Sequence, residues 1–117
     1  MIKIEAIVHP FRLDSIKLAL DGLGIEGITI SHVLGHGGPM GLKAVYRGAE
    51  YRVDVPRVKL EMLVSSLQTD EVIDALLQAA RTNGPGDDGT ILVTEIADAI
   101  SVRTGERIRS TISHDPL

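Results

Sequence analysis

The segment VKLEMLV, residues 58–64, has the alternation that determines the class of fold. In an extended chain, one face of this segment carries only the apolar residues Val58, Leu60, Met62 and Val64. Lys59 and Leu63 fall on the opposite face. A period of two residues with one apolar face is typical of a β-strand that covers a core on one side.

Further segments of the same kind flank this strand. Before it, a strand ending near Val8 is predicted from the alternating residues Ile2, Ile4, Ala6 and Val8. The β-branched residues within 25–34 predict a second strand. After it, we expect a short strand at 91–93, a helical turn at 96–100 and a brief apolar strand around Val102.

Two segments have helical periodicity. The first predicted helix has apolar residues at helical spacing and ends before Gly24, and its apolar residues are Leu13, Ile16, Leu20 and Leu23. Thr69 is the expected N-cap of the second helix, with Asp70 and Glu71 in its first turn. The buried stripe of this helix is predicted to be Val72, Ile73, Leu76, Leu77 and Ala80.

The resulting order is βαββαβ, which predicts an α+β ferredoxin-like sandwich with both helices on one face of an antiparallel sheet. The other face has no cover from this chain. Its residues are too apolar for a solvated surface and too charged for a dry core: Ile7, Val33, Leu63, Lys3, Glu5 and Lys59. We therefore expect an oligomer that buries this face.

Composition narrows the class of function. The chain has 117 residues, 44% hydrophobic and 24% charged, which fits one soluble, cytoplasmic domain. It has no cysteine, and its net charge of −4 argues against nucleic-acid binding. His32 and His36 would stand about 13 Å apart on a strand, too far to share a metal ion. No nucleophile has an evident base, so we predict neither an enzyme nor a metal site.

Three segments that connect or follow the predicted strands and helices are rich in glycine or in charged residues. The first spans about 20 residues between the second and third strands, where a hairpin needs only about two to five. The second is TNGPGDDGT, residues 82–90, whose glycines allow an anion nest. The third is RTGE, residues 103–106. On local sequence alone, the two shorter pieces are better explained as simple tight turns than as ligand-binding segments.

The segment YRGAEY, residues 46–51, a Gly-x-Gly at the start of the same loop, the Gly-Asp turn and RTGE together resemble the PII signal-transduction family. The resemblance covers residues 1–106, and residues 107–117 form a divergent tail. It implies a homotrimer that binds an adenine nucleotide between subunits. It also implies a long T-loop, about residues 36–56, that controls a membrane transporter or a metabolic enzyme.

Carried over residue by residue, the resemblance implies a nucleotide site that has fewer positively charged side chains than other family members. A glutamine that helps to hold magnesium and 2-oxoglutarate is replaced by Pro39, a phosphate-contacting lysine by Thr90, and an arginine by Ser101. The implied nucleotide-binding residues are Thr29, Gly37, Gly38, Pro39, Leu63, Gly86, Asp87, Asp88, Gly89, Thr90 and Arg103. We therefore expect ADP or AMP to bind at least as tightly as ATP, with no covalently bound cofactor.

The tyrosines of the loop are implied to meet a partner, and Tyr51 is the modified residue in some family members. The expected contact residues are Tyr46, Arg47, Glu50, Tyr51 and Arg52. Packing of both tyrosines along the loop's own stem is the alternative. Two further alternatives for the whole protein are an adaptor that does not respond to ligands and a sensor of another small anion such as bicarbonate.

Overall fold

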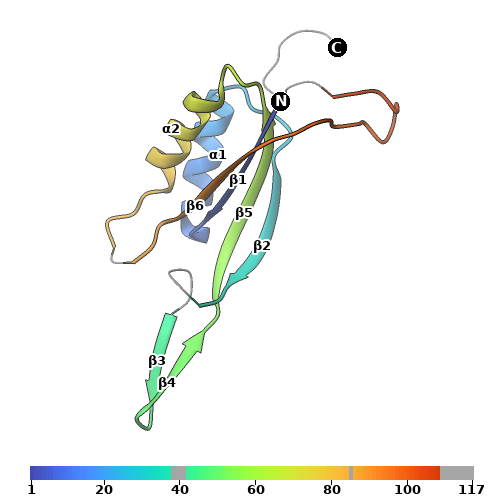
Figure 1. The fold of residues 1–117 in the computed structure, drawn as a ribbon. Helices are drawn as coiled ribbons and strands as arrows, with labels where there is room; N and C mark the ends of the chain where they lie inside the picture. The colour runs from blue at the N-terminus through green and yellow to red at the C-terminus, as the bar shows by residue number, and fades with distance from the viewer. Residues whose placement is uncertain (38–41, 85, 109–117) are drawn as a thin grey trace.

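The computed structural model describes residues 1–37, 42–84 and 86–108, with the backbone alone for residues 42–44, 51 and 52. Its body is an antiparallel sheet in the order β2-β5-β1-β6 with two helices on one face (Figure 1). These elements are β1 (Ile2–Val8), α1 (Leu13–Gly22), β2 (Thr29–Gly35), β5 (Val55–Val64), α2 (Thr69–Ala80) and β6 (Gly89–Glu95). The predicted α+β order and sheet are confirmed.

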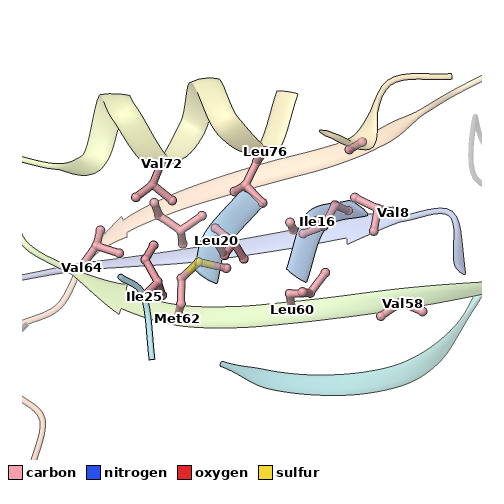
Figure 2. Close-up of a cluster of buried hydrophobic side chains, with 13 residues drawn as sticks. Val8, Ile16, Leu20, Ile25, Val58, Leu60, Met62, Val64, Val72 and Leu76 are labelled. Atoms are coloured by element: carbon pink, nitrogen blue, oxygen red, sulfur yellow. The ribbon is translucent and has the colours of Figure 1, made fainter. Parts of the chain in front are cut away.

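Strand β5 lies between β1 and β2 and carries the predicted apolar face. Its register against β1 places Met62 opposite Ile4 and Leu60 opposite Ala6, so the apolar faces of the two strands coincide. Leu60 is fully buried beneath the helices (Figure 2), and Ile4 is fully buried as well. Burying an aliphatic side chain of this size stabilises the fold by about 1.5–3 kcal/mol. This alternation therefore holds the sheet and the helices together.

The helices complete the core with residues predicted from their periodicity, although Ile73 and Leu77 of the predicted stripe are only half-buried. Ile16 and Leu20 of α1, and Val72 and Leu76 of α2, are almost completely buried (Figure 2). Helix α1 ends as expected, because Gly24 has φ of +76° and the Ile25 N–H donates to the Leu20 carbonyl oxygen at 3.1 Å. Both helices thus place one apolar stripe against the sheet.

Two predicted boundaries are wrong for local reasons. Strand β2 begins at Thr29 and not at residue 25, because Ile25 is still bonded to α1 and Gly27 has φ of +69°. Thr69 is the first residue of α2 and not its N-cap. Gln68 occupies that position, and the Thr69 hydroxyl donates instead to the Ser65 carbonyl oxygen at 3.0 Å.

The end of the described chain also differs from the prediction. Strand β6 is longer than residues 91–93, and residues 96–100 form no helical turn. Val102 lies in a turn and not in a strand. It belongs to a hairpin over residues 99–108, the C-terminal hairpin, in which Ile100 forms a bridge with Arg107. This hairpin extends beyond the end of β6 (Figure 1).

The long connection between β2 and β5 contains a second, two-stranded sheet. It is formed by β3 (Leu42–Tyr46) and β4 (Ala49–Val53), and it projects from the lower end of β2 and β5 (Figure 1). Arg47 and Gly48 form its turn with φ of +52° and +77°. Two residues with positive φ are the signature of a type I′ turn, which matches the twist of the flanking strands.

Candidate functional site

The face of the sheet opposite the helices carries a network of ion pairs. Lys3 Nζ lies 2.9 Å from Glu61 Oε2 and 3.4 Å from Glu5 Oε1, and Lys59 Nζ lies 3.5 Å from Glu61 Oε1. The hydrogen bond between Lys3 and Glu61 is the main cause of a lowered pKa for Glu61 and a raised pKa for Lys3. Ile7, Val33 and Leu63 share this face and are half-buried, as are the charged residues. The face therefore has the mixed character that the sequence predicts.

A pocket of about 350 Å³ opens on this face at the start of β1. Thr29 and Leu63, predicted as ligand contacts from different strands, both line it. The register explains their meeting, since Thr29 is opposite Glu61 in β5 and Leu63 is opposite Lys3 in β1. The volume is within the range of small-molecule sites, about 300–1,000 Å³. Three adjacent strands thus form one cavity with apolar and charged groups.

Ile108 also lines this pocket, and sequence reasoning missed it. The residue lies beyond the segment that resembles the family, within the tail that the sequence analysis set apart. The only signal was a single isoleucine between Arg107 and Arg109. Its position depends on the C-terminal hairpin, which the sequence analysis did not predict.

The glycine-rich turn between α2 and β6 is held by two side chains. The Thr82 hydroxyl donates to Asp88 Oδ1 at 2.6 Å, and this hydrogen bond lowers the pKa of Asp88. His9 Nε2 donates to the Asp87 carbonyl oxygen at 2.8 Å. Gly86 has φ of +99°, in the region that favours glycine. The Asp88 carboxylate, which would repel a phosphate, is therefore engaged within the turn.

Gly89 has a structural reason to be glycine. It has φ of +127°, and a Cβ atom at this position would lie 2.1 Å from the Ile7 carbonyl oxygen of β1. The next residue, Thr90, is exposed and pairs with Ile7. The backbone of the turn therefore approaches β1 more closely than any side chain would permit.

Arg103 lies in the exposed turn of the C-terminal hairpin. Two hydrogen bonds of 2.8 Å shape this turn, from Ser101 N to the Glu106 carbonyl and from Gly105 N to the Ser101 carbonyl. Neither Arg103 nor the glycine-rich turn is among the described residues that line the pocket. Gly38 and Pro39 lie outside the described residues, and Gly37, with φ of +64°, immediately precedes them.

The pocket and the glycine-rich turn lie at opposite ends of β1. Leu63 of the pocket pairs with Lys3, and Gly89 of the turn pairs with Val8. Lys3 and Val8 are five positions apart along the strand, or about 16 Å at roughly 3.3 Å per residue. A single chain therefore does not bring all the predicted contact residues into one cavity.

The predicted partner residues lie on the β3–β4 hairpin. Tyr46 and Arg47 are exposed, and the Arg47 guanidinium carbon lies 5.3 Å from the centre of the Tyr46 ring. Such a cation–π contact at an exposed site contributes about 0.5–1 kcal/mol. Glu50 is exposed. For Tyr51 and Arg52 the backbone pairs with Ala44 and Lys43, and their side chains lie outside the description.

A histidine and an aspartate join the two chain segments at the base of this hairpin. His36 Nδ1 contacts Asp54 Oδ1, linking the residue after β2 to the residue before β5. The sequence analysis considered His36 only as a metal ligand. Within the described ranges, no group of three or more His, Cys, Asp or Glu side chains is arranged to hold a metal ion. Within the same ranges, no helix is long and apolar enough to span a membrane.

Comparison with known proteins points to one family. The family model for nitrogen regulatory protein P-II matches residues 1–106. The nitrogen regulatory protein P-II of Rhodospirillum rubrum is 47% identical over 108 residues, which cover 92% of this chain and 96% of that protein. The protein of the same name from Pasteurella multocida is 43% identical, over 96% of this chain and 100% of its own length.

A solved structure shows the same fold. The crystal structure of Arabidopsis thaliana PII bound to citrate superposes with a TM-score of 0.71 at 39% sequence identity. The match covers 91% of this chain and 86% of the Arabidopsis chain. The family model, the similar sequences and the similar structure all span most of the chain, and the protein therefore belongs to the nitrogen regulatory protein P-II family.

Proposed function

We propose that the protein is a non-enzymatic regulator that binds an adenine nucleotide between the subunits of a homotrimer. The observation that carries this proposal is the pocket at which Thr29 and Leu63 meet. Both residues match adenine-contacting positions of the PII family, and the fold places them on one cavity of suitable size. The protein is expected to act in the cytoplasm.

Three features support a trimer with shared sites. The sheet face that carries Ile7 and Leu63 is half apolar, and neither α1 nor α2, the helices of the described residues, lies over it (Figure 1). Ile100 and Val102 of the C-terminal hairpin are 57% and 102% exposed, so two apolar side chains that are close in sequence both face solvent in the single chain. The separation of the pocket from the glycine-rich turn is the third feature. A neighbouring copy that brought its turn and Arg103 to this pocket would complete the site.

The small number of positively charged side chains at the proposed phosphate site favours a nucleotide with few phosphates. Thr90 and Ser101 cannot make the charge-assisted hydrogen bonds that lysine and arginine would make at these positions, each worth about 1.5–3 kcal/mol. The base pocket and the backbone of the glycine-rich turn do not depend on these cations. We therefore infer that ADP and AMP bind at least as tightly as ATP.

The T-loop is the proposed contact with a membrane transporter or a metabolic enzyme. In this chain it comprises the β3–β4 hairpin and its flanks, about residues 36–56. The hairpin forms a sheet of its own and exposes Tyr46, Arg47 and Glu50. A projecting hairpin with an aromatic residue and charged residues near its tip suits contact with another protein.

Isothermal titration calorimetry with ADP tests this proposal. We expect saturable binding with one site per chain, and a trimer by light scattering. Thr29→Tyr would fill the pocket and abolish binding, whereas Ile30→Tyr, one residue along β2, places the same side chain on the other face and should leave binding intact. Absence of ADP binding to the wild-type trimer would refute the proposal.

A second candidate function is a sensor of a small anion such as bicarbonate. The Arabidopsis relative is bound to citrate, itself a small anion. Titration of the wild-type protein with bicarbonate and with citrate, in the absence of nucleotide, distinguishes this function from nucleotide binding. A protein that binds none of these ligands and still captures its partner would be a ligand-insensitive adaptor.

A further inference from the structure

The C-terminal hairpin holds Ile108 in a defined place. The Ile108 N–H donates to the Ala99 carbonyl oxygen at 2.7 Å, and the bridge between Ile100 and Arg107 precedes this bond. Arg107 Nε also lies 2.6 Å from Asp98 Oδ2, an ion pair that joins the second arm of the hairpin to the residue just before its first arm. The hairpin returns the chain toward the start of β1 (Figure 1). Ile108 is thus fixed by contacts with residues about ten positions earlier in the chain.

Ile108 is half-buried, whereas residues 102–107 of the same hairpin are exposed. The reason is its contact with the pocket, which it lines together with Thr29, Leu63 and the Lys3–Glu61 pair. Those residues belong to strands of the sheet, and Ile108 lies outside the sheet. The pocket therefore has an apolar wall that comes from the C-terminal hairpin of the same chain.

We propose that Ile108 is a ligand-contacting residue that closes the base pocket of its own subunit. This inference rests on the proposed nucleotide function. An apolar side chain suits the flat face of a heterocyclic base, while the Thr29 hydroxyl and the Lys3–Glu61 pair offer hydrogen-bonding groups to its edge. A bound base would thus contact both the sheet and the hairpin.

Ligand binding and the conformation of the hairpin are then linked. A ligand that contacts Ile108 binds more tightly when the hairpin is closed, so it shifts the population toward the closed hairpin. Occupancy of the pocket would in this way be transmitted to Arg103, in the turn of the same hairpin. The effect requires no movement of the sheet.

The chain has no cysteine, so single-cysteine variants can report the position of residue 108 without any ligand. Ile108→Cys is compared with Leu67→Cys, because Leu67 is 96% exposed and lies outside the hairpin. Labelling by a maleimide is measured for the folded trimers and normalised to the rate in urea. We expect the thiol of Ile108→Cys to react at least about tenfold more slowly than that of Leu67→Cys, since access requires the hairpin to open. Equal rates would overturn the proposal.

The second measurement is ADP affinity. Ile108→Ala removes most of the apolar wall and should weaken ADP binding roughly tenfold, a loss that corresponds to about 1.4 kcal/mol. Leu67→Ala shortens an apolar side chain that is 96% exposed and lies outside the hairpin, and it should leave the affinity unchanged. Unchanged or tighter binding by Ile108→Ala would overturn the proposal. If the wild-type protein binds no ADP, the proposed function fails, and the labelling rates alone decide whether Ile108 closes the pocket.

Discussion

Gly89 of β6 and Ile7 of β1 approach each other so closely that a Cβ atom on residue 89 would lie 2.1 Å from the Ile7 carbonyl oxygen. The family resemblance implied that Gly89 contacts the nucleotide. The structure shows that residue 89 must be glycine even without a ligand. At this residue the glycine-rich turn continues into β6, and the backbone passes too close to β1 for a side chain. The packing of the glycine-rich turn against the sheet therefore depends on glycine at residue 89.

Replacement of Gly89 by alanine is predicted to destabilise the protein. The positive φ and the close approach to Ile7 together should lower the free energy of unfolding by at least about 2 kcal/mol. Gly22→Ala is the matched control, because a Cβ there meets nothing within 4 Å and its helical backbone accepts alanine. That variant should gain about 0.5 kcal/mol. Urea unfolding at one protein concentration measures both, and equal effects would contradict the assignment.

The Lys3–Glu61 pair predicts a dependence of stability on pH. The pKa of Glu61 in the folded protein lies below its ordinary value of 4.5 because of the hydrogen bond from Lys3. The contribution of the pair is therefore fully present above pH 4.5 and is lost as the pH falls through the folded pKa. Glu61→Gln should reduce stability at pH 7, and this effect should decline as the pH falls below 4.5. A difference that stays constant over this range would show that the ion pair does not contribute.

His9 is predicted to order the glycine-rich turn. His9→Ala removes the hydrogen bond to the Asp87 carbonyl oxygen and the stacking on Phe11, whose ring centre lies 5.1 Å away. The loss should be about 1 kcal/mol of unfolding free energy, with faster hydrogen exchange in the turn. His32→Ala, at an exposed position of β2, is the control. Exchange in the turn that is unaffected by His9→Ala would argue against this role.

Deletion of residues 43–52 is predicted to leave the body of the protein intact. These residues belong to a two-stranded sheet that is separate from the main sheet. The trimer mass should be unchanged, and the ADP affinity should stay within about twofold of wild type, or roughly 0.4 kcal/mol. Capture of the partner protein should be lost. Loss of the trimer would instead show that this hairpin takes part in assembly.

The sequence predicted the body of the fold because each core strand and helix has one apolar face. The alternation from Val58 to Val64 determined β5, and the register with β1 followed from matching faces. The boundaries were harder to predict, because they depend on single contacts. The hydrogen bond from the Ile25 N–H to the Leu20 carbonyl oxygen keeps residue 25 out of β2. The hydrogen bond from the Thr69 hydroxyl to the Ser65 carbonyl oxygen engages the side chain that was expected to cap α2.

Two parts of the candidate site could not be predicted. The β3–β4 turn uses Arg47 at a position with positive φ, where asparagine, aspartate or glycine is the usual signal, so the hairpin was predicted only as a long loop. The position of Ile108 depends on a hairpin that is closed by Arg107 and Asp98, nine residues apart. Neither the Arg47 turn nor the ion pair between Arg107 and Asp98 produces a periodic pattern in the sequence. Thr29 and Leu63, in contrast, lie on strands whose pairing brings them together.

The central claim is that this family member binds adenine nucleotides with a phosphate clamp that lacks two cations. The most direct test is calorimetric titration of the wild-type trimer with AMP, ADP and ATP, beside the double variant Thr90→Lys, Ser101→Arg. We predict that the wild type binds ADP and AMP at least as tightly as ATP, and that the double variant shifts this preference toward ATP by at least about tenfold, or 1.4 kcal/mol. A wild-type protein that already prefers ATP by about tenfold would contradict the account.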